Sequence, residues 1–145
     1  MIRILFLCTG NSCRSQMAEG WARHLKGDEI QAFSAGVESR GLDQRAVKVM
    51  AEAGVDISDQ RSKELQELGD MEFDYVITVC DHAREMCPLF PGKATMLHRS
   101  FPDPPRLARD ESEEEAKLLH YRSVRDEIRS FVEELAEELV VSERK

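Results

Sequence analysis

The 145-residue sequence lacks any long apolar run and any tract rich in lysine. Its apolar opening segment, residues 4–7, is too short for the core of a signal peptide or for a membrane span. The formal net charge of −8 argues against nucleic acid and anionic membranes as partners, because both attract positive surfaces. We therefore expect a cytoplasmic protein that binds neither.

Internal repeats, low-complexity tracts and linkers are also missing. A chain of this length can bury a core of its own, so we expect one domain over residues 1–145 and, by default, a monomer. The excess of acidic residues carries a further consequence. An anionic substrate would be repelled by the protein as a whole and would have to be held by a local positive field.

Short apolar runs, which predict strands, alternate along the chain with helically spaced apolar residues, which predict helices. The expected strands cover residues 2–7, 30–35, 74–80 and 94–98. Helical spacing follows the first strand, and Asp43 and Ser112 are placed to cap two later helices. This order favours an α/β fold in three layers, with a four-stranded parallel sheet and helices on both faces.

The turn after the first strand contains the motif Cys-x5-Arg-Ser, residues 8–15. Such a turn can point successive backbone N–H groups at one anion and add the positive end of a helix. Gly10 and Asn11 tolerate left-handed backbone, and the Arg14 guanidinium matches two oxygens of a tetrahedral anion. The predicted oxyanion-binding residues are Thr9, Gly10, Asn11, Ser12, Cys13 and Arg14.

Cys8 ends the first strand and begins this loop. A thiol at a helix N-terminus near a guanidinium can have its pKa lowered from about 8.5 to roughly 3.5–7.5. We therefore predict that Cys8 is a thiolate nucleophile, with Ser15 donating to its sulfur and relaying a proton. The alternative is an ordinary polar turn beside a buried cysteine, because Cys-x5-Arg also occurs by chance.

Three more cysteines follow, Cys13, Cys80 and Cys87. Nothing marks secretion, and in a reducing compartment thiols serve metal binding, catalysis or redox exchange. Cys80 follows a predicted strand and should lie at the same sheet edge as Cys8. Inert burial of Cys80 and Cys87, or half of a metal site completed by Cys13 and histidines, stays open; we expect no metal and no cofactor.

These motifs resemble the low-molecular-weight tyrosine phosphatase superfamily and, within it, the thioredoxin-coupled arsenate reductases. Residues 8–21 are close to the reductase signature, with Gln16 where phosphatases usually carry proline. Residues 34–36 (Ser-Ala-Gly) and 78–88 agree as well. The resemblance implies a low-molecular-weight phosphatase-like fold and a general acid at Asp103, which precedes a proline.

The implied activity is reduction of arsenate to arsenite, as in arsenic detoxification. Cys8 attacks arsenate while Asp103 protonates the leaving oxygen; Cys80 then attacks Cys8, releasing arsenite and leaving a disulfide. Cys87 takes over the disulfide, and thioredoxin reduces it. Phosphate and sulfate would compete for the loop. A helix between Cys80 and Cys87 would hold them about 10 Å apart, so we expect residues 81–90 to rearrange on oxidation.

Some reductases of this family bind potassium beside the loop through Asn, Glu, Ser and Asp. Asn11, Glu19 and Ser34 match the first three ligands, but Lys63 stands at the Asp position. Our hypothesis is that Lys63 pairs with Glu19, steadies Asn11 and replaces potassium; the alternative is a plain surface lysine. A low-molecular-weight protein tyrosine phosphatase and a non-enzymatic redox sensor remain the alternative functions.

Overall fold

The computed structural model describes residues 1–80 and 94–143. Cys87 and the predicted rearranging segment, 81–90, lie outside the described residues. Among the described residues, four parallel strands form one sheet in the order β2-β1-β3-β4. The strands are β1 (Ile2–Cys8), β2 (Ile30–Gly36), β3 (Tyr75–Thr78) and β4 (Thr95–His98), which confirms the four predicted strands.

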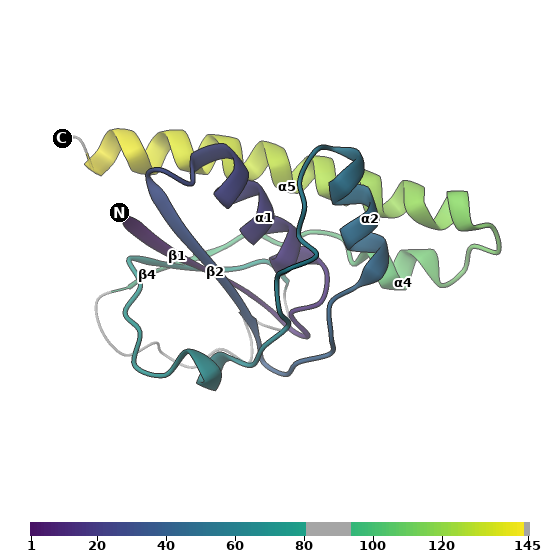
Figure 1. Ribbon diagram of the computed structural model, residues 1–145, viewed down its shortest axis with the longest axis horizontal. Coiled ribbons are helices and arrows are strands. Elements are labelled where there is room, and N and C mark those ends of the chain that lie inside the picture. The colour runs from purple at the N-terminus through teal and green to yellow at the C-terminus, as the bar shows by residue number, and fades with distance from the viewer. Residues whose placement is uncertain (81–93, 144–145) are drawn as a thin grey trace.

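The helices connect and cover these strands (Figure 1). They are α1 (Arg14–Lys26), α2 (Gln44–Glu52), the 3-10 helix η1 (Leu65–Leu68), α4 (Pro104–Ala108) and α5 (Glu114–Glu143). Asp43 caps α2 as predicted, accepting from the N–H groups of Arg45 and Ala46. The predicted cap of α5 is wrong: the helix begins at Glu114, so residue 113, not Ser112, flanks it.

The sheet is covered on both faces, because Ile4, Leu5, Phe6 and Leu7 of β1 are all buried. On one face, α1 packs against α5, and the indole N–H of Trp21 donates to the backbone carbonyl of Arg125 at 3.2 Å. The opposite face is covered by the chain from 65 to 73, including η1 (Figure 1). The predicted three-layer α/β architecture is therefore confirmed.

The strand order brings three loops to one edge of the sheet. Cys8, the last residue of β1, pairs in register with Gly36 at the end of β2. On the other side, the N–H of Val79 donates to the carbonyl of Leu7 at 2.9 Å, which brings Cys80 beside the end of β1. Loops at this edge collect functional residues in parallel sheets. None of the described helices combines the length and the apolar character needed to cross a membrane.

Candidate active site

The loop 8–14 is held from outside by the segment 37–43. Four backbone N–H groups of that segment donate to loop carbonyls: Val37 to Cys8 at 3.2 Å, and Glu38, Arg40 and Asp43 to Thr9, Gly10 and Ser12, each at 3.0 Å. In a trans peptide the N–H points away from the C=O. Because these carbonyls face outward, the following N–H groups of the loop face inward, as an oxyanion cradle requires.

Glycines allow this segment to approach the loop closely. A Cβ atom on Gly36 would lie 2.4 Å from the carbonyl oxygen of Glu38 and 2.8 Å from the backbone nitrogen of Asn11. Asn11 has a φ of 49°, which confirms the expected left-handed residue. Gly10, which was noted as tolerating left-handed backbone, does not have a positive φ; a Cβ there would lie 2.7 Å from Cδ of Arg40, so the Arg40 side chain packs directly on this glycine.

A buried network of side-chain amides fixes Asn11. Its Nδ2 donates to Oγ of Ser15 at 2.8 Å, and its Oδ1 accepts from Nε2 of Gln16 at 3.0 Å and from the N–H of Lys63 at 2.9 Å. Gln60 in turn donates to Oε1 of Gln16 at 2.8 Å. The strained left-handed residue is therefore held by hydrogen bonds from two directions. Gln60 was not predicted, because no local pattern marks it.

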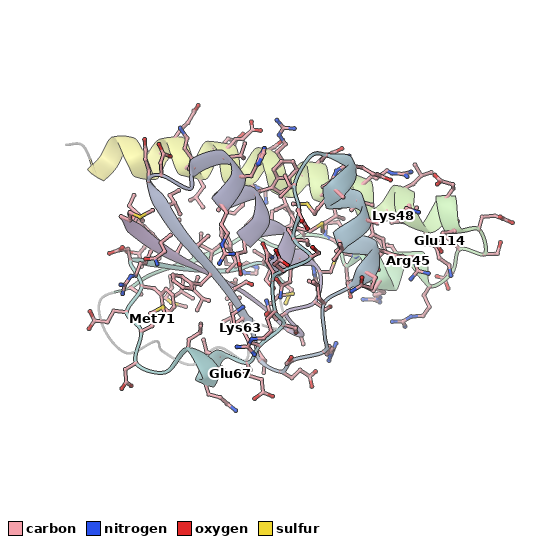
Figure 2. The ribbon with its side chains drawn as sticks, in the orientation of Figure 1. Arg45, Lys48, Lys63, Glu67, Met71 and Glu114 are labelled. Atoms are coloured by element: carbon pink, nitrogen blue, oxygen red, sulfur yellow. The ribbon has the colours of Figure 1, made fainter. Side chains whose placement is uncertain are left out.

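Ser34 and Lys63, which were predicted to stabilise the loop, both lie close to the Glu19 carboxylate. Oγ of Ser34 donates to Oε1 of Glu19 at 2.6 Å, and Nζ of Lys63 lies 4.0 Å from the same oxygen. Figure 2 labels Lys63 on the segment that leads into η1; its Nζ also donates to the carbonyl of Arg61 at 2.9 Å. The pKa of Lys63 is lowered, because the effect of burial exceeds the opposing effect of the Glu19 carboxylate. Lys63 is thus part of a half-buried cluster and not a plain surface lysine.

Arg23 completes the charge balance around Glu19, with Nη2 at 2.9 Å from Oε2. We did not predict this pair, although its i,i+4 spacing on one helix is a recognisable signal. With Arg23 and Lys63 nearby, the nearly inaccessible Glu19 carboxylate faces two cations. Within residues 1–80 and 94–143, no cluster of three His, Cys, Asp or Glu side chains could hold a metal ion.

Arg14 and Asp103 meet as the motif predicts. Nη1 of Arg14 donates to the carbonyl of Phe101 at 2.9 Å, and Nη2 lies 3.8 Å from Oδ1 of Asp103, the residue that precedes α4. They line a cavity of about 690 Å³ at the carboxyl edge of the sheet. The cavity is lined by Thr9, Arg14, Arg40, Cys80, Ser100, Phe101, Pro102, Asp103, Arg106 and Leu107.

Cys80 follows β3 at the edge where β1 ends in Cys8, and both residues are buried. Oγ1 of Thr9 lies 3.1 Å from Sγ of Cys80. The contact with Cys80 and burial raise the pKa of Cys8, while Arg14 and the N–H of Thr9 lower it. The predicted lowering of this pKa is therefore wrong. It counted the guanidinium and the helix end but not the second thiol.

Cys13, Ser12 and Ser15 are surrounded by groups that support the loop. Burial, followed by the nearby Asp43 carboxylate, raises the pKa of Cys13. The hydroxyl of Tyr121 donates to Oδ2 of Asp43 at 2.7 Å, which ties α5 to the residue that holds Ser12. Ser15 is buried and accepts from Asn11; the predicted bond from Ser15 to Cys8 stays a prediction.

The chain matches known proteins over nearly its whole length. The family model for low molecular weight phosphotyrosine protein phosphatase covers residues 3–145. A curated arsenate reductase of Halalkalibacterium halodurans is 46% identical over 134 residues, which are 92% of this chain and 94% of that protein.

Two solved structures extend the likeness to the fold. An arsenate reductase in the phosphate binding state has a TM-score of 0.75 and 29% identity, over 95% of this chain and 98% of that one. The thioredoxin-dependent arsenate reductase of Corynebacterium glutamicum has a TM-score of 0.73 and 25% identity, over 98% of this chain and 63% of that one. The chain belongs to the low molecular weight phosphotyrosine protein phosphatase family and, within it, to the arsenate reductases.

Proposed function

We propose that this protein reduces arsenate to arsenite, with Cys8 as the nucleophile in the loop 8–14. The observation that carries the proposal is the position of a second buried thiol at the loop: Val79 donates to the carbonyl of Leu7, and Sγ of Cys80 lies 3.1 Å from Oγ1 of Thr9, the residue after Cys8. Hydrolysis of a phosphate ester needs one nucleophilic thiol and has no use for a second thiol beside it. Reduction needs two thiols, because a disulfide is formed as arsenic gains two electrons.

The first step forms a bond between sulfur and arsenic. The loop N–H groups and Arg14 bind the arsenate dianion. Because the pKa of Cys8 is raised, its thiol loses its proton as the anion binds, through the hydroxyl of Ser15 to an arsenate oxygen. The thiolate attacks arsenic, and the displaced oxygen leaves as water after protonation by Asp103, which lies 3.8 Å from Arg14.

The second step is the redox step. The Cys80 thiol passes its proton to an arsenic-bound oxygen, and the resulting thiolate attacks the sulfur of Cys8; the S–S bond forms, the S–As bond breaks, and its electron pair stays on arsenic. Arsenic(V) becomes arsenic(III) and leaves as arsenite, while the two sulfurs are oxidised together by two electrons. Thr9, 3.1 Å from Sγ of Cys80, can donate a hydrogen bond to that thiolate.

Regeneration requires a further thiol and an external reductant. Cys87 attacks Cys80, which frees Cys8 and leaves a Cys80–Cys87 disulfide. Thioredoxin, the reductant in the name of the Corynebacterium glutamicum relative, reduces that disulfide and supplies the two electrons. We place this reaction in the cytoplasm, in a monomer with a single domain over residues 1–145.

Lys63 takes the place of a bound cation in this proposal. Its Nζ lies 4.0 Å from Glu19, and its N–H holds Oδ1 of Asn11. An ammonium at this position supplies the positive charge that potassium would bring. The Glu19 cluster therefore supports the loop without an added metal ion.

The alternative is hydrolysis of phosphotyrosine, which the family name favours. The pairing of Arg14 with Asp103 suits either reaction, because phosphate and arsenate are both tetrahedral anions. Phosphate and sulfate should accordingly compete with arsenate. Weak phosphatase activity is compatible with the proposal and does not separate the two functions.

The test is arsenate-dependent oxidation of NADPH in the presence of thioredoxin and its reductase. Wild type should turn over, and Cys80→Ser and Cys87→Ser should each abolish turnover. Hydrolysis of an aryl phosphate by the same two variants is the control, since it needs only the loop and should persist. Brisk hydrolysis without any arsenate turnover by wild type would favour the phosphatase instead, and a redox sensor would show neither activity.

A further inference from the structure

Arg40 lies against the oxyanion loop but was not predicted as a site residue. Its N–H donates to the carbonyl of Gly10 at 3.0 Å, and its side-chain stem rests on Gly10, where a Cβ would lie 2.7 Å from Cδ of Arg40. Its side chain also lines the cavity of Arg14 and Asp103. Backbone and stem thus anchor a second guanidinium at the site.

Arg40 and Arg14 differ in exposure and in their partners. The Arg14 side chain is 13% exposed and bonded to the Phe101 carbonyl, whereas the Arg40 side chain is 60% exposed. An anion entering the cavity from solvent therefore meets Arg40 before Arg14. The protein carries a net charge of −8, so a cation at the exposed rim offsets long-range repulsion of the substrate.

Glu38 is the present partner of Arg40. Its carboxylate forms an ion pair with Nη2 of Arg40, and its N–H donates to the carbonyl of Thr9. The Glu38 side chain is 50% exposed, and exposed ion pairs of this kind are weak. Among the described residues that line the cavity, Asp103 is the one acidic residue. Glu38 is not among the lining residues, so it pairs with Arg40 from outside the cavity.

We propose that Arg40 is a second binding residue for the oxyanion and that Glu38 is the counter-ion the oxyanion displaces. Arg40 thereby sets the affinity for tetrahedral oxyanions and leaves the chemical step to the loop and the cysteines. The inference rests on the proposed function, because it assigns Arg40 to the same substrate. It requires no rearrangement of the backbone, since both residues are anchored to the loop by main-chain hydrogen bonds.

Equilibrium binding of inorganic phosphate, measured by calorimetry at low salt, tests this assignment without turnover. Arg40→Gln should weaken binding by about fivefold, and Glu38→Gln should tighten it by about two- to threefold, as expected for one partly exposed charge. Arg40→Lys should restore part of the affinity. In arsenate turnover, Arg40→Gln should raise KM by a similar factor with little change in kcat.

The matched control is the pair Arg129–Glu133 on α5, with side chains 50% and 48% exposed and outside the cavity lining. Arg129→Gln and Glu133→Gln should leave phosphate affinity unchanged. Equal phosphate affinities of wild type and Arg40→Gln, or weaker phosphate binding by Glu38→Gln, would overturn the role of Arg40. If wild type still turned over arsenate, the proposed function would stand. Absence of both phosphate binding and turnover in wild type would overturn both.

Discussion

The thiol of Cys8 is subject to two opposing influences. The guanidinium of Arg14 and the N–H of Thr9 stabilise its thiolate, while hydrogen bonding to Cys80 and burial stabilise the thiol. The effects of Cys80 and burial are the larger, so the pKa of Cys8 rises. The second thiol, which makes reduction possible, therefore also disfavours the thiolate form of Cys8 before substrate binds.

Removing Cys80 should lower the pKa of Cys8, because the contact with Cys80 is the largest cause of its rise. The pH dependence of alkylation by iodoacetamide, read at each cysteine by mass spectrometry, measures this. In Cys80→Ala the midpoint for Cys8 should move to lower pH than in wild type. Cys13, which is buried in the same loop, is the internal control and should react slowly in both proteins. An unchanged midpoint would contradict the assignment.

Elements, in contrast to single residues, were largely predictable from sequence. The apolar run of β1, the left-handed Asn11 and the Asp43 cap of α2 are local features, and each was recognised. The short helices η1 and α4 were missed, since four or five residues carry little periodicity. Neither element alters the sheet order, so the site edge was still placed correctly.

Site residues could be predicted where they belong to a sequence motif. Residues that only the tertiary fold brings close to the loop could not. Arg14 and Asp103 come from distant motifs and meet as expected. Gln60 and Arg40 contact the loop across long stretches of sequence and have no local signal. The raised pKa of Cys8 depends in the same way on a neighbour 72 positions away.

The cluster that joins α1, β2 and the segment before η1 should make the loop independent of potassium. Exchanging sodium for potassium at equal ionic strength should leave the arsenate turnover rate of wild type unchanged, because Lys63 already supplies a positive charge near Glu19. Lys63→Asp should become activated by potassium. Lys48→Asp, at an exposed lysine of α2, is the matched control and should stay insensitive. Strong potassium activation of wild type would refute the role of Lys63.

The stability of the whole molecule should fall at high pH. Cys8 and Cys13 have raised pKa values in the folded protein, so both bind protons that the unfolded chain loses above about pH 8.5. Their stabilising contribution is complete below that pH and is lost as the pH rises towards the folded pKa values. The slope is about 1.4 kcal/mol per pH unit for each thiol.

Urea unfolding under reducing conditions between pH 8 and 10 measures this slope. Tyr121, whose pKa burial and Asp43 raise, should add to the loss only near the upper limit. Cys8→Ser removes one of the two thiols and should reduce the slope by about half at pH 9. A free energy of unfolding that stays constant over this range would contradict the raised pKa values.

A single turnover of Cys87→Ser with arsenate and no thioredoxin tests most directly whether Cys80 attacks Cys8 once arsenic is bound. Without Cys87 the relay should stop after the redox step. Mass spectrometry should then find a Cys8–Cys80 disulfide and one equivalent of arsenite per protein. Release of arsenite without this disulfide, or no arsenite while Cys8 and Cys80 both remain reduced, would show that Cys80 does not attack Cys8.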